Sequence, residues 1–280
     1  MIAEPKMLEY AAEAIVSAEA LVITAGAGMG VDSGLPDFRG PQGFWRDYPP
    51  YARLGLSFEQ LANPEWFERD PALAWGFYGH RLELYRRALP HEGFACLHRW
   101  AQAKGRGHFV FTSNVDGQFQ RAGFAEDRVL ECHGSLIHFQ CATPCCAATW
   151  PAPEVLPFMV DLATMQAVGE WPRCRSCGGP ARPNVLMFDD ERWCPGRTSV
   201  QQVRFQAWLR SLARGKFVVL EIGAGTRVPT VRAASEQMAE AGRVPLIRIN
   251  PRDLAGPPNA MALEGTALAV LRELDARIFA

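Results

Sequence analysis

The segment at residues 25–40, AGAGMGVDSGLPDFRG, begins like a dinucleotide-binding turn but does not finish as one. Residues 21–24 before it read as a short buried strand. Gly26 and Gly28 then form a turn without side chains, which lets backbone N–H groups approach a pyrophosphate. The third glycine of the G-x-G-x-x-G fingerprint would fall where Val31 stands. The segment therefore predicts a nucleotide site but disfavours the turn of a simple dehydrogenase.

The second half of this segment is a polar loop instead of a long amphipathic helix. Gly34 and Pro36 interrupt the helix that a dehydrogenase turn would start. The loop carries Asp37, Phe38 and Arg39 directly after the turn, so we expect it to fold over a bound dinucleotide. A glycine-rich surface turn that binds nothing is the alternative.

Short apolar runs alternate with helical segments and predict an α/β fold, a doubly wound, Rossmann-like parallel sheet. The runs are residues 21–24, 108–112, 129–132, 184–188, 217–222 and 245–249. Two segments interrupt this alternation, a helical insertion at residues 41–90 and a cysteine-bearing module at 141–180. We expect both to form a smaller lobe. The nucleotide-binding domain then comprises residues 1–40, 91–140 and 181–280, with ligands beyond the carboxyl ends of its strands.

The cysteines of the second insertion have the spacing of metal ligands. Cys141, Cys145 and Cys146 lie in CATPCC, and Cys174 and Cys177 form CRSC. Two close cysteine pairs separated along the chain are typical of a tetrahedral zinc site that stabilises a small module. Cys141 can pair with Cys145 or Cys146, and the proline before Cys145 favours the former. Free buried thiols are the alternative.

The charge balance of the chain limits the kinds of partner that can be expected. Lysine plus arginine (29) nearly balances aspartate plus glutamate (30), and the net charge is -1. This balance gives no reason to expect nucleic acid or a membrane surface as a partner. Residues 1–15 lack the charged start and apolar core of a secretion signal, and no apolar run approaches bilayer length. We expect a cytoplasmic protein and favour a monomer.

Two further polar motifs follow predicted strands. Residues 112–117, TSNVDG, carry Asn114 beside Asp116, an amide near an acceptor-only carboxylate. Residues 131–136, ECHGSL, carry His133, whose imidazole titrates near neutrality and suits a general base. Because the carboxyl ends of parallel strands meet at one edge of a sheet, these side chains are expected near the glycine turn.

The order of these motifs resembles that of the sirtuin family, NAD-consuming protein deacylases, whose motifs read GAGxSxxSGIPDFR, TQNID and HGS. The resemblance spans nearly the whole chain. It implies NAD as a consumed co-substrate, a structural zinc ion, and the catalytic residues His133 and Asn114. The residues that stand at the positions of the family's NAD contacts are Gly26, Ala27, Gly28, Asp37, Phe38, Arg39, Ser113, Asn114, Asp116, Gly223, Gly225 and Asn250. For Asn250, a cap at the end of a strand is the alternative.

The resemblance also implies a mechanism. The acyl oxygen of a modified lysine attacks the anomeric carbon of the nicotinamide ribose and expels nicotinamide. His133 then takes a proton from a ribose hydroxyl, whose attack carries the acyl group to ADP-ribose. Asn114 would face the ribose, and Asp116 would accept from the carboxamide NH2.

Two segments bear on the substrate, which the resemblance identifies as an acyl-lysine protein or peptide. Residues 181–188, ARPNVLMF, resemble the family's RPxVVWF strand, whose edge pairs with a peptide, here through Val185, Met187 and Phe188. Tyr78 and Arg81 share one face of a predicted helix. Their Y-x-x-R spacing resembles that of sirtuins preferring succinyl- or malonyl-lysine, in which the pair binds the acyl carboxylate. A solvated helix face is the alternative.

The chain departs from the family at several positions. Gly30 stands in place of a serine, Ser113 in place of a glutamine, Met187 in place of a tryptophan, and Phe94 and Phe119 in place of histidines. Asp189-Asp190 replaces Gly-Glu and puts peptide recognition in question. An NAD glycohydrolase or ADP-ribosyltransferase, a deacylase of a small acylated amine, and a non-enzymatic NAD sensor are therefore alternative functions.

Overall fold

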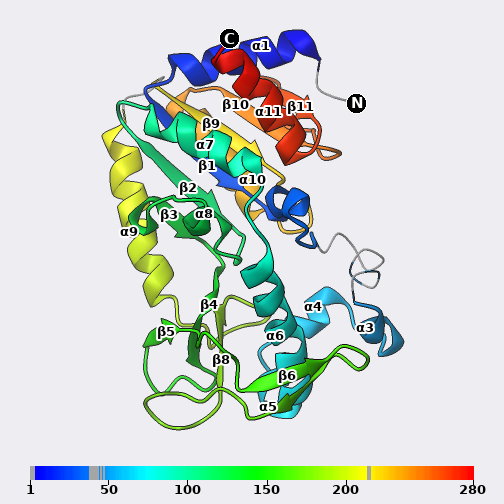
Figure 1. The fold of residues 1–280 in the computed structure, drawn as a ribbon. Coiled ribbons are helices and arrows are strands. Elements are labelled where there is room, and N and C mark those ends of the chain that lie inside the picture. Colours follow the sequence, from blue (N-terminus) through cyan, green and yellow to red (C-terminus); the bar gives the residue numbers. More distant parts are fainter. Residues whose placement is uncertain (1–3, 38–43, 45, 47, 213–215) are drawn as a thin grey trace.

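A parallel sheet of six strands forms the centre of the larger lobe (Figure 1). The computed structural model describes residues 4–37, 44, 46, 48–212 and 216–280. The strands are β1 (Ala20–Ala25), β2 (His108–Thr112), β3 (Val129–Glu131), β9 (Phe217–Ile222), β10 (Leu246–Asn250) and β11 (Ala260–Glu264). They lie in the order β11-β10-β9-β1-β2-β3, with every neighbouring pair parallel. The strand order reverses between β1 and β9, which confirms the predicted doubly wound fold.

Helices cover both faces of this sheet because alternate side chains of its buried strands point to opposite sides. Leu21 and Ile23 of β1 belong to the core formed with α1 (Pro5–Ser17), α7 (Glu92–Gln102) and α11 (Ala267–Ile278). Ala20 and Val22 belong to the core formed with α9 (Gly196–Ser211) and α10 (Thr230–Gly242). A strand buried on both faces reads as a continuous apolar run, which explains why the sequence reveals it.

One predicted strand lies in a different sheet, so that part of the sequence interpretation was wrong. The strand expected at residues 184–188 is β8 (Ala181–Val185), which pairs antiparallel with β4 (Gly134–Cys141) in the small lobe. The sixth parallel strand is instead β11, which the sequence did not suggest. Every residue of β8 is buried, including the polar residues Arg182 and Asn184. These polar residues interrupt the apolar run by which a buried strand is recognised in a sequence. Only two of the five β11 side chains are strongly apolar, and four are partly or fully exposed.

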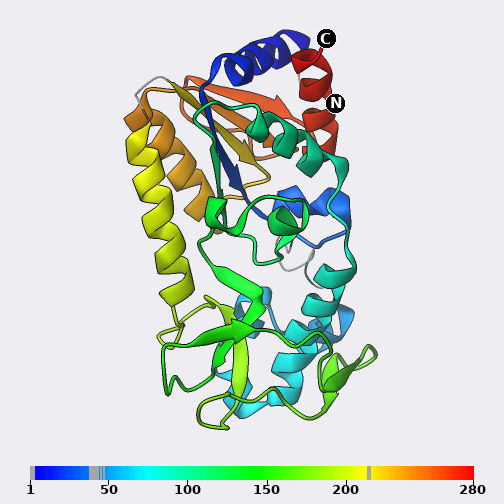
Figure 2. The same cartoon turned by 60° about the vertical axis from the view of Figure 1, so that its left-hand side comes forward.

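The small lobe combines short helices with antiparallel strands and lies at one end of the larger lobe (Figure 1, Figure 2). Its strands form a sheet in the order β5-β4-β8 and a separate hairpin of β6 and β7. The remaining elements are α3 (Pro49–Arg53), α4 (Phe58–Leu61), α5 (Trp66–Arg69), α6 (Pro71–Arg87), β5 (Thr149–Pro151), β6 (Phe158–Asp161) and β7 (Gln166–Gly169). Because β4 and β8 belong to this sheet, we propose lobe boundaries near residues 133 and 186.

The two insertions share one aromatic core. Trp75 of α6 packs against Phe139 of β4 and Phe158 of β6, with ring centroids 5.2 and 5.5 Å apart. Gly76 lets the β6–β7 hairpin approach α6, since a Cβ there would stand 2.0 Å from the Met165 carbonyl oxygen. Helix α6 thereby packs against both the β5-β4-β8 sheet and the β6–β7 hairpin. Among the described residues, no helix combines the length and hydropathy needed to span a bilayer.

Candidate active site

A cavity of about 570 Å³ is lined by residues of both lobes and lies beyond the carboxyl ends of the parallel strands. Most of the predicted site residues line it: Gly26, Ala27, Gly28, Asp37, Tyr78, Arg81, Ser113, Asn114, Asp116, His133, Val185, Met187, Phe188, Gly223 and Gly225. Phe38 and Arg39 lie outside the described residues. Asn250 is fully buried and is absent from the cavity wall. The volume is in the range of small-ligand sites.

The glycines of the first motif bring two loops of the cavity wall together. A Cβ at Gly28 would stand 2.6 Å from Gly223 Cα, and the Gly28 N–H donates to the Gly223 carbonyl at 3.0 Å. Gly223 has a φ of +63°, a conformation that favours glycine. The chain continues as the short 3₁₀ helix η1 (Ala27–Ser33) and ends it at Gly34, so the absence of a long helix is confirmed.

Asn114 is held at the carboxyl end of β2. Thr112 Oγ1 donates to the Ala25 carbonyl at 2.9 Å and accepts from the Asn114 backbone N–H at 3.0 Å. The Asn114 side-chain Nδ2 donates to the Gly26 carbonyl at 3.0 Å. The second motif is therefore fixed against the first, although the two are far apart in the sequence.

Asp116 lies in the same wall and is buried. Burial raises the pKa of its carboxyl to about 6, and the hydrogen bond from the Gln118 backbone N–H opposes this shift. The carboxyl is therefore largely ionised at pH 7 and accepts hydrogen bonds only. It takes up a proton as the pH falls through about 6.

His133 lies between β3 and β4, where the chain leaves the large lobe. Its carbonyl accepts from the Leu186 N–H at 3.0 Å, and the next residue, Gly134, has a φ of +77°. A Cβ at Gly134 would stand 2.1 Å from the Asn184 carbonyl oxygen, so glycine is required there. Burial lowers the pKa of His133 below its usual value of 6.5. The imidazole is therefore neutral at pH 7, the form that can accept a proton.

Tyr78 and Arg81 are both buried in the cavity wall, so the alternative of a solvated helix face was wrong. Arg81 Nε and Nη2 donate to the Tyr85 hydroxyl at 3.1 and 2.8 Å. The guanidinium also lies over the rings of Phe77 and Tyr78, 5.1 and 5.8 Å from their centroids. Tyr85 is a site residue that we did not predict, and its only sequence signal is its place one helical turn after Arg81.

A second unpredicted feature joins the lobes at the cavity. Glu59 of α4 forms an ion pair with Arg227 in the loop after β9, and both residues line the cavity. Exposed pairs of this kind contribute little to stability. Nothing in the local sequence around either residue indicates the other.

Neither Asp189 nor Asp190, which replace the family's Gly-Glu, lines the cavity. Asp190 forms a bidentate, fully buried ion pair with Arg182, with N–O distances of 2.7 and 2.9 Å. Its Oδ2 also accepts from the Met187 N–H at 3.2 Å, which fixes the cavity-lining segment after β8. Asp189 adopts the left-handed φ of +53°, which suits the glycine that the family has there.

This geometry predicts the effects of two substitutions at Asp189. Asp189→Val should lower the free energy of unfolding by about 1–2 kcal/mol, because a β-branched residue is strained at positive φ. Asp189→Gly should change it by less than about 1 kcal/mol, because relief of strain offsets the greater chain entropy of glycine. Urea unfolding of both variants tests this. A valine variant as stable as the parent would contradict it.

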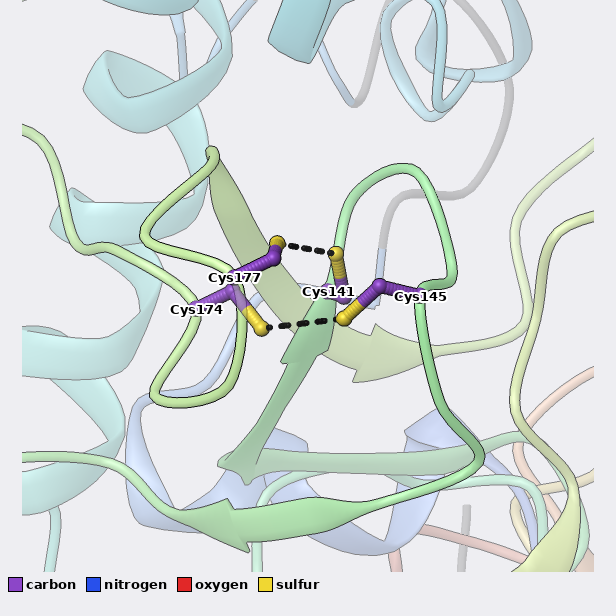
Figure 3. Close-up of side chains that lie close together, drawn as sticks. All are labelled: Cys141, Cys145, Cys174 and Cys177. Atoms are coloured by element: carbon purple, nitrogen blue, oxygen red, sulfur yellow. Dashed lines mark hydrogen bonds between the residues drawn. The ribbon is translucent and has the colours of Figure 1, made fainter.

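Four cysteines form a compact cluster in the small lobe that could hold a metal ion (Figure 3). The sulfur atoms of Cys141, Cys145, Cys174 and Cys177 all lie within 4.8 Å of one another. Cys141 Sγ is 3.8 Å from Cys177 Sγ, and Cys145 Sγ is 3.6 Å from Cys174 Sγ. Four thiolates in a compact cluster fit tetrahedral zinc. Cys145 belongs to this cluster, whereas Cys146 lies beside it with its Sγ 3.5 Å from the Ser176 hydroxyl, which favours Cys145 as the ligand.

Two of the departures from the family pattern pack against each other away from the cavity. The rings of Phe94 in α7 and Phe119 in α8 (Gln118–Arg121) lie 5.0 Å apart at 70°. Both are buried in the core of the large lobe, and neither lines the cavity. The two phenylalanines that replace histidines therefore contact each other in the apolar core and not the cavity.

A two-lobed α/β protein with a cavity at its strand ends and a four-cysteine module defines a narrow structural class. The sequence model described as "Sir2 family" matches residues 26–204. NAD-dependent protein deacylase 2 of Pyrobaculum aerophilum is 33% identical over 272 residues, covering 94% of this chain and 92% of that protein. The crystal structure of a Sir2 homolog–NAD complex has a TM-score of 0.70 and 26% identity, covering 97% and 93% of the two chains. The chain belongs to the Sir2 family.

A further relative is the mitochondrial NAD-dependent protein deacylase sirtuin-5 of Danio rerio. It is 34% identical over 198 residues, which cover 64% of this chain and 59% of that protein.

Proposed function

We propose that this member of the Sir2 family, an NAD-dependent deacylase, removes acidic acyl groups such as succinyl or malonyl from lysine. In this proposal the acyl group passes to ADP-ribose and nicotinamide is released. The observation that supports it best is the meeting of Asn114, Asp116, His133 and Arg81 in one cavity. The proposed preference for an acidic acyl group rests on Arg81. The deacylase activity itself does not depend on this preference.

The side chains of the cavity suit distinct roles. NAD supplies an electrophilic anomeric carbon when it is bound. Gly26 and Gly28 leave the backbone of the first motif open to the pyrophosphate. Asn114, fixed by its bond to the Gly26 carbonyl, orients the nicotinamide ribose, and ionised Asp116 accepts from the carboxamide. His133 accepts a proton from a ribose hydroxyl, which its neutral state at pH 7 permits.

The acidic acyl preference follows from charge and burial at the small-lobe side of the cavity. The Arg81 guanidinium is buried in the wall, and the Tyr85 hydroxyl holds it in place. A fixed guanidinium binds a carboxylate with charge-assisted hydrogen bonds, and the Tyr78 phenol one turn earlier can add another. An acetyl group offers these side chains no charge to bind.

Arg81→Ala tests this preference. We expect kcat/KM for a succinyl-lysine peptide to fall by about 10- to 100-fold, as for loss of hydrogen bonds to a charged group. Activity on the acetyl-lysine peptide should change far less. Arg87→Ala is the matched control, because Arg87 lies on the same helix with its side chain 81% exposed. An equal loss on both peptides would reject the role of Arg81 in carboxylate binding.

One observation favours a small acylated amine as an alternative substrate. The backbone N–H groups of Leu186, Met187 and Phe188 already donate to His133, Asp190 and Ala62. A peptide cannot use them to extend β8, which weakens the expectation of strand pairing at this edge. Comparing kcat/KM for an acyl-lysine peptide with that for free acyl-lysine distinguishes the two substrates. Comparable values would favour the small amine.

Product analysis separates deacylation from simple NAD cleavage. A deacylase forms acyl-ADP-ribose only with an acylated acceptor, whereas a glycohydrolase releases nicotinamide and ADP-ribose from NAD alone. An ADP-ribosyltransferase would modify another nucleophile. Nicotinamide release at the same rate without any acyl substrate would reject the proposed function. A cytoplasmic location and a monomeric state stay predictions.

A further inference from the structure

The loop that follows β10 contributes Arg252 and Asp253 to the cavity wall, and buried side chains hold it from behind. Asn250 Oδ1 accepts from the backbone N–H groups of Arg252 and Asp253 at 3.2 and 3.1 Å. Its Nδ2 donates to the Ala224 carbonyl at 2.9 Å. Asn250 thus joins this loop to the glycine loop after β9, as expected for the alternative role of a cap at the end of a strand.

Arg232 makes the same connection from α10. Its Nη1 donates to the Asp253 carbonyl at 2.8 Å and contacts the Ala224 carbonyl at 3.5 Å, and its Nη2 donates to the Ala255 carbonyl. Two of these acceptors belong to the loop after β10 and one belongs to the glycine loop. Only 8% of Arg232 is exposed, so this cation is committed to backbone carbonyl groups. One side chain therefore contacts both loops behind the cavity wall.

Arg248 supports the arrangement from inside the sheet. It is fully buried in β10, directly across from Glu221 in β9, and binds that carboxylate through Nε and Nη2 at 2.6 and 3.0 Å. Nη2 also donates to Glu236 at 2.7 Å, and Nη1 donates to the Ala255 carbonyl. A buried ion pair adds little net stability compared with apolar residues of similar volume. The ion pair does hold the Arg248 guanidinium in the position from which Nη1 donates to the Ala255 carbonyl of the loop.

We propose that Arg232 and Arg248 are positioning residues that hold residues 251–255 against residues 223–225 and thereby set the affinity for NAD. They do not touch the cavity themselves, and they act through backbone carbonyl groups. The proposal rests on the proposed function, because it assumes that NAD occupies this cavity. It adds residues that the sequence motifs did not indicate.

Gly256 allows a test that leaves both arginines in place. A Cβ at this position would stand 2.2 Å from Arg248 Nη1. Nη1 can move away only if the bidentate contact with Glu221 is broken; otherwise residue 256 must move away from Arg248. Either movement displaces the neighbouring Ala255 carbonyl from Nη1, so we expect Gly256→Ala to weaken this contact. Gly105→Ala is the matched control, because a Cβ at this exposed turn would meet no atom within 4 Å.

For Gly256→Ala, we expect the KM for NAD to rise about tenfold, as for the loss of a hydrogen bond to a charged group. The KM for the acyl substrate and kcat at saturating NAD should stay near the parent values. Arg232→Lys should act in the same direction, because a lysine ammonium does not reproduce the fixed fork of guanidinium donors that binds the Asp253 and Ala255 carbonyls. Binding of ADP-ribose, measured by calorimetry, should weaken in parallel for both variants. The control should match the parent.

Other outcomes would overturn the proposal. Unchanged NAD KM and ADP-ribose affinity in folded Gly256→Ala and Arg232→Lys variants would show that the loop does not depend on these contacts. A uniform loss of kcat and of affinity for both substrates would indicate a general structural role instead. Failure of the parent protein to consume NAD would reject the proposed function. The two proposals are thus tested separately. Results for the variants, with a parent protein that consumes NAD, bear on the present inference and leave the proposed function unchanged.

Discussion

His133→Ala should lower kcat/KM for deacylation by about 10²–10⁴-fold, the usual contribution of a general base. The side chain lies in the cavity with Asn114 and Asp116, and burial keeps its imidazole neutral at pH 7. In the proposed mechanism His133 acts after the bond to nicotinamide is broken, so exchange of labelled nicotinamide into NAD should persist. Both rates are measured on the same preparation, with acyl-ADP-ribose as the product of the complete reaction.

His138→Ala is the matched control for this prediction. His138 is five residues further along, in β4, and does not line the cavity. We expect its replacement to leave kcat near the parent value. Equal turnover by the His133→Ala and parent proteins would remove the proposed mechanism. Loss of nicotinamide exchange together with acyl transfer would instead assign His133 to substrate binding.

Cys145→Ser should remove zinc from the protein and unfold the small lobe. Structural zinc sites contribute on the order of 10 kcal/mol to the stability of the modules that contain them. The Cys145 sulfur belongs to the compact cluster, and its loss leaves three thiolates. We expect the parent to hold one zinc ion per chain and the variant to hold almost none. Hydrogen exchange over residues 141–180 should then accelerate strongly.

Cys146→Ser provides the control, because Cys146 is the neighbouring residue and lies outside the four-sulfur cluster. It should retain one zinc ion and the parent melting temperature. The parallel strands of the larger lobe should keep their slow exchange in both variants, since their cores contain none of the four metal ligands. Zinc retained by Cys145→Ser and lost by Cys146→Ser would reverse the assignment of the ligands.

Much of the cavity could be predicted because its motifs are short and follow strands. The glycine turn, Asn114 and His133 each come directly after a buried run, and parallel strands bring their carboxyl ends to one edge. Tyr78 and Arg81 could be paired because three residues separate neighbours on one helix face. Their burial could not be predicted, since it depends on rings from several elements of the small lobe.

Asn250 shows that one motif position allows more than one contact. The sequence places it at the end of a strand, where either a ligand or a neighbouring loop can use its amide. The structure directs the amide to the Ala224 carbonyl and to the backbone of its own loop. The choice depends on the glycine loop after β9, which is close in space and distant along the chain.

The sequence by itself determined the fold class, the family, the cysteine pairs and the strand-end motifs, because each depends on local spacing or on burial patterns along one element. Only the tertiary structure decided which sheet holds β8, that Phe94 meets Phe119, that Asp190 pairs with Arg182, and that buried arginines support the cavity wall. These contacts join residues from separate elements, and side-chain periodicity within one element carries no information about its partner.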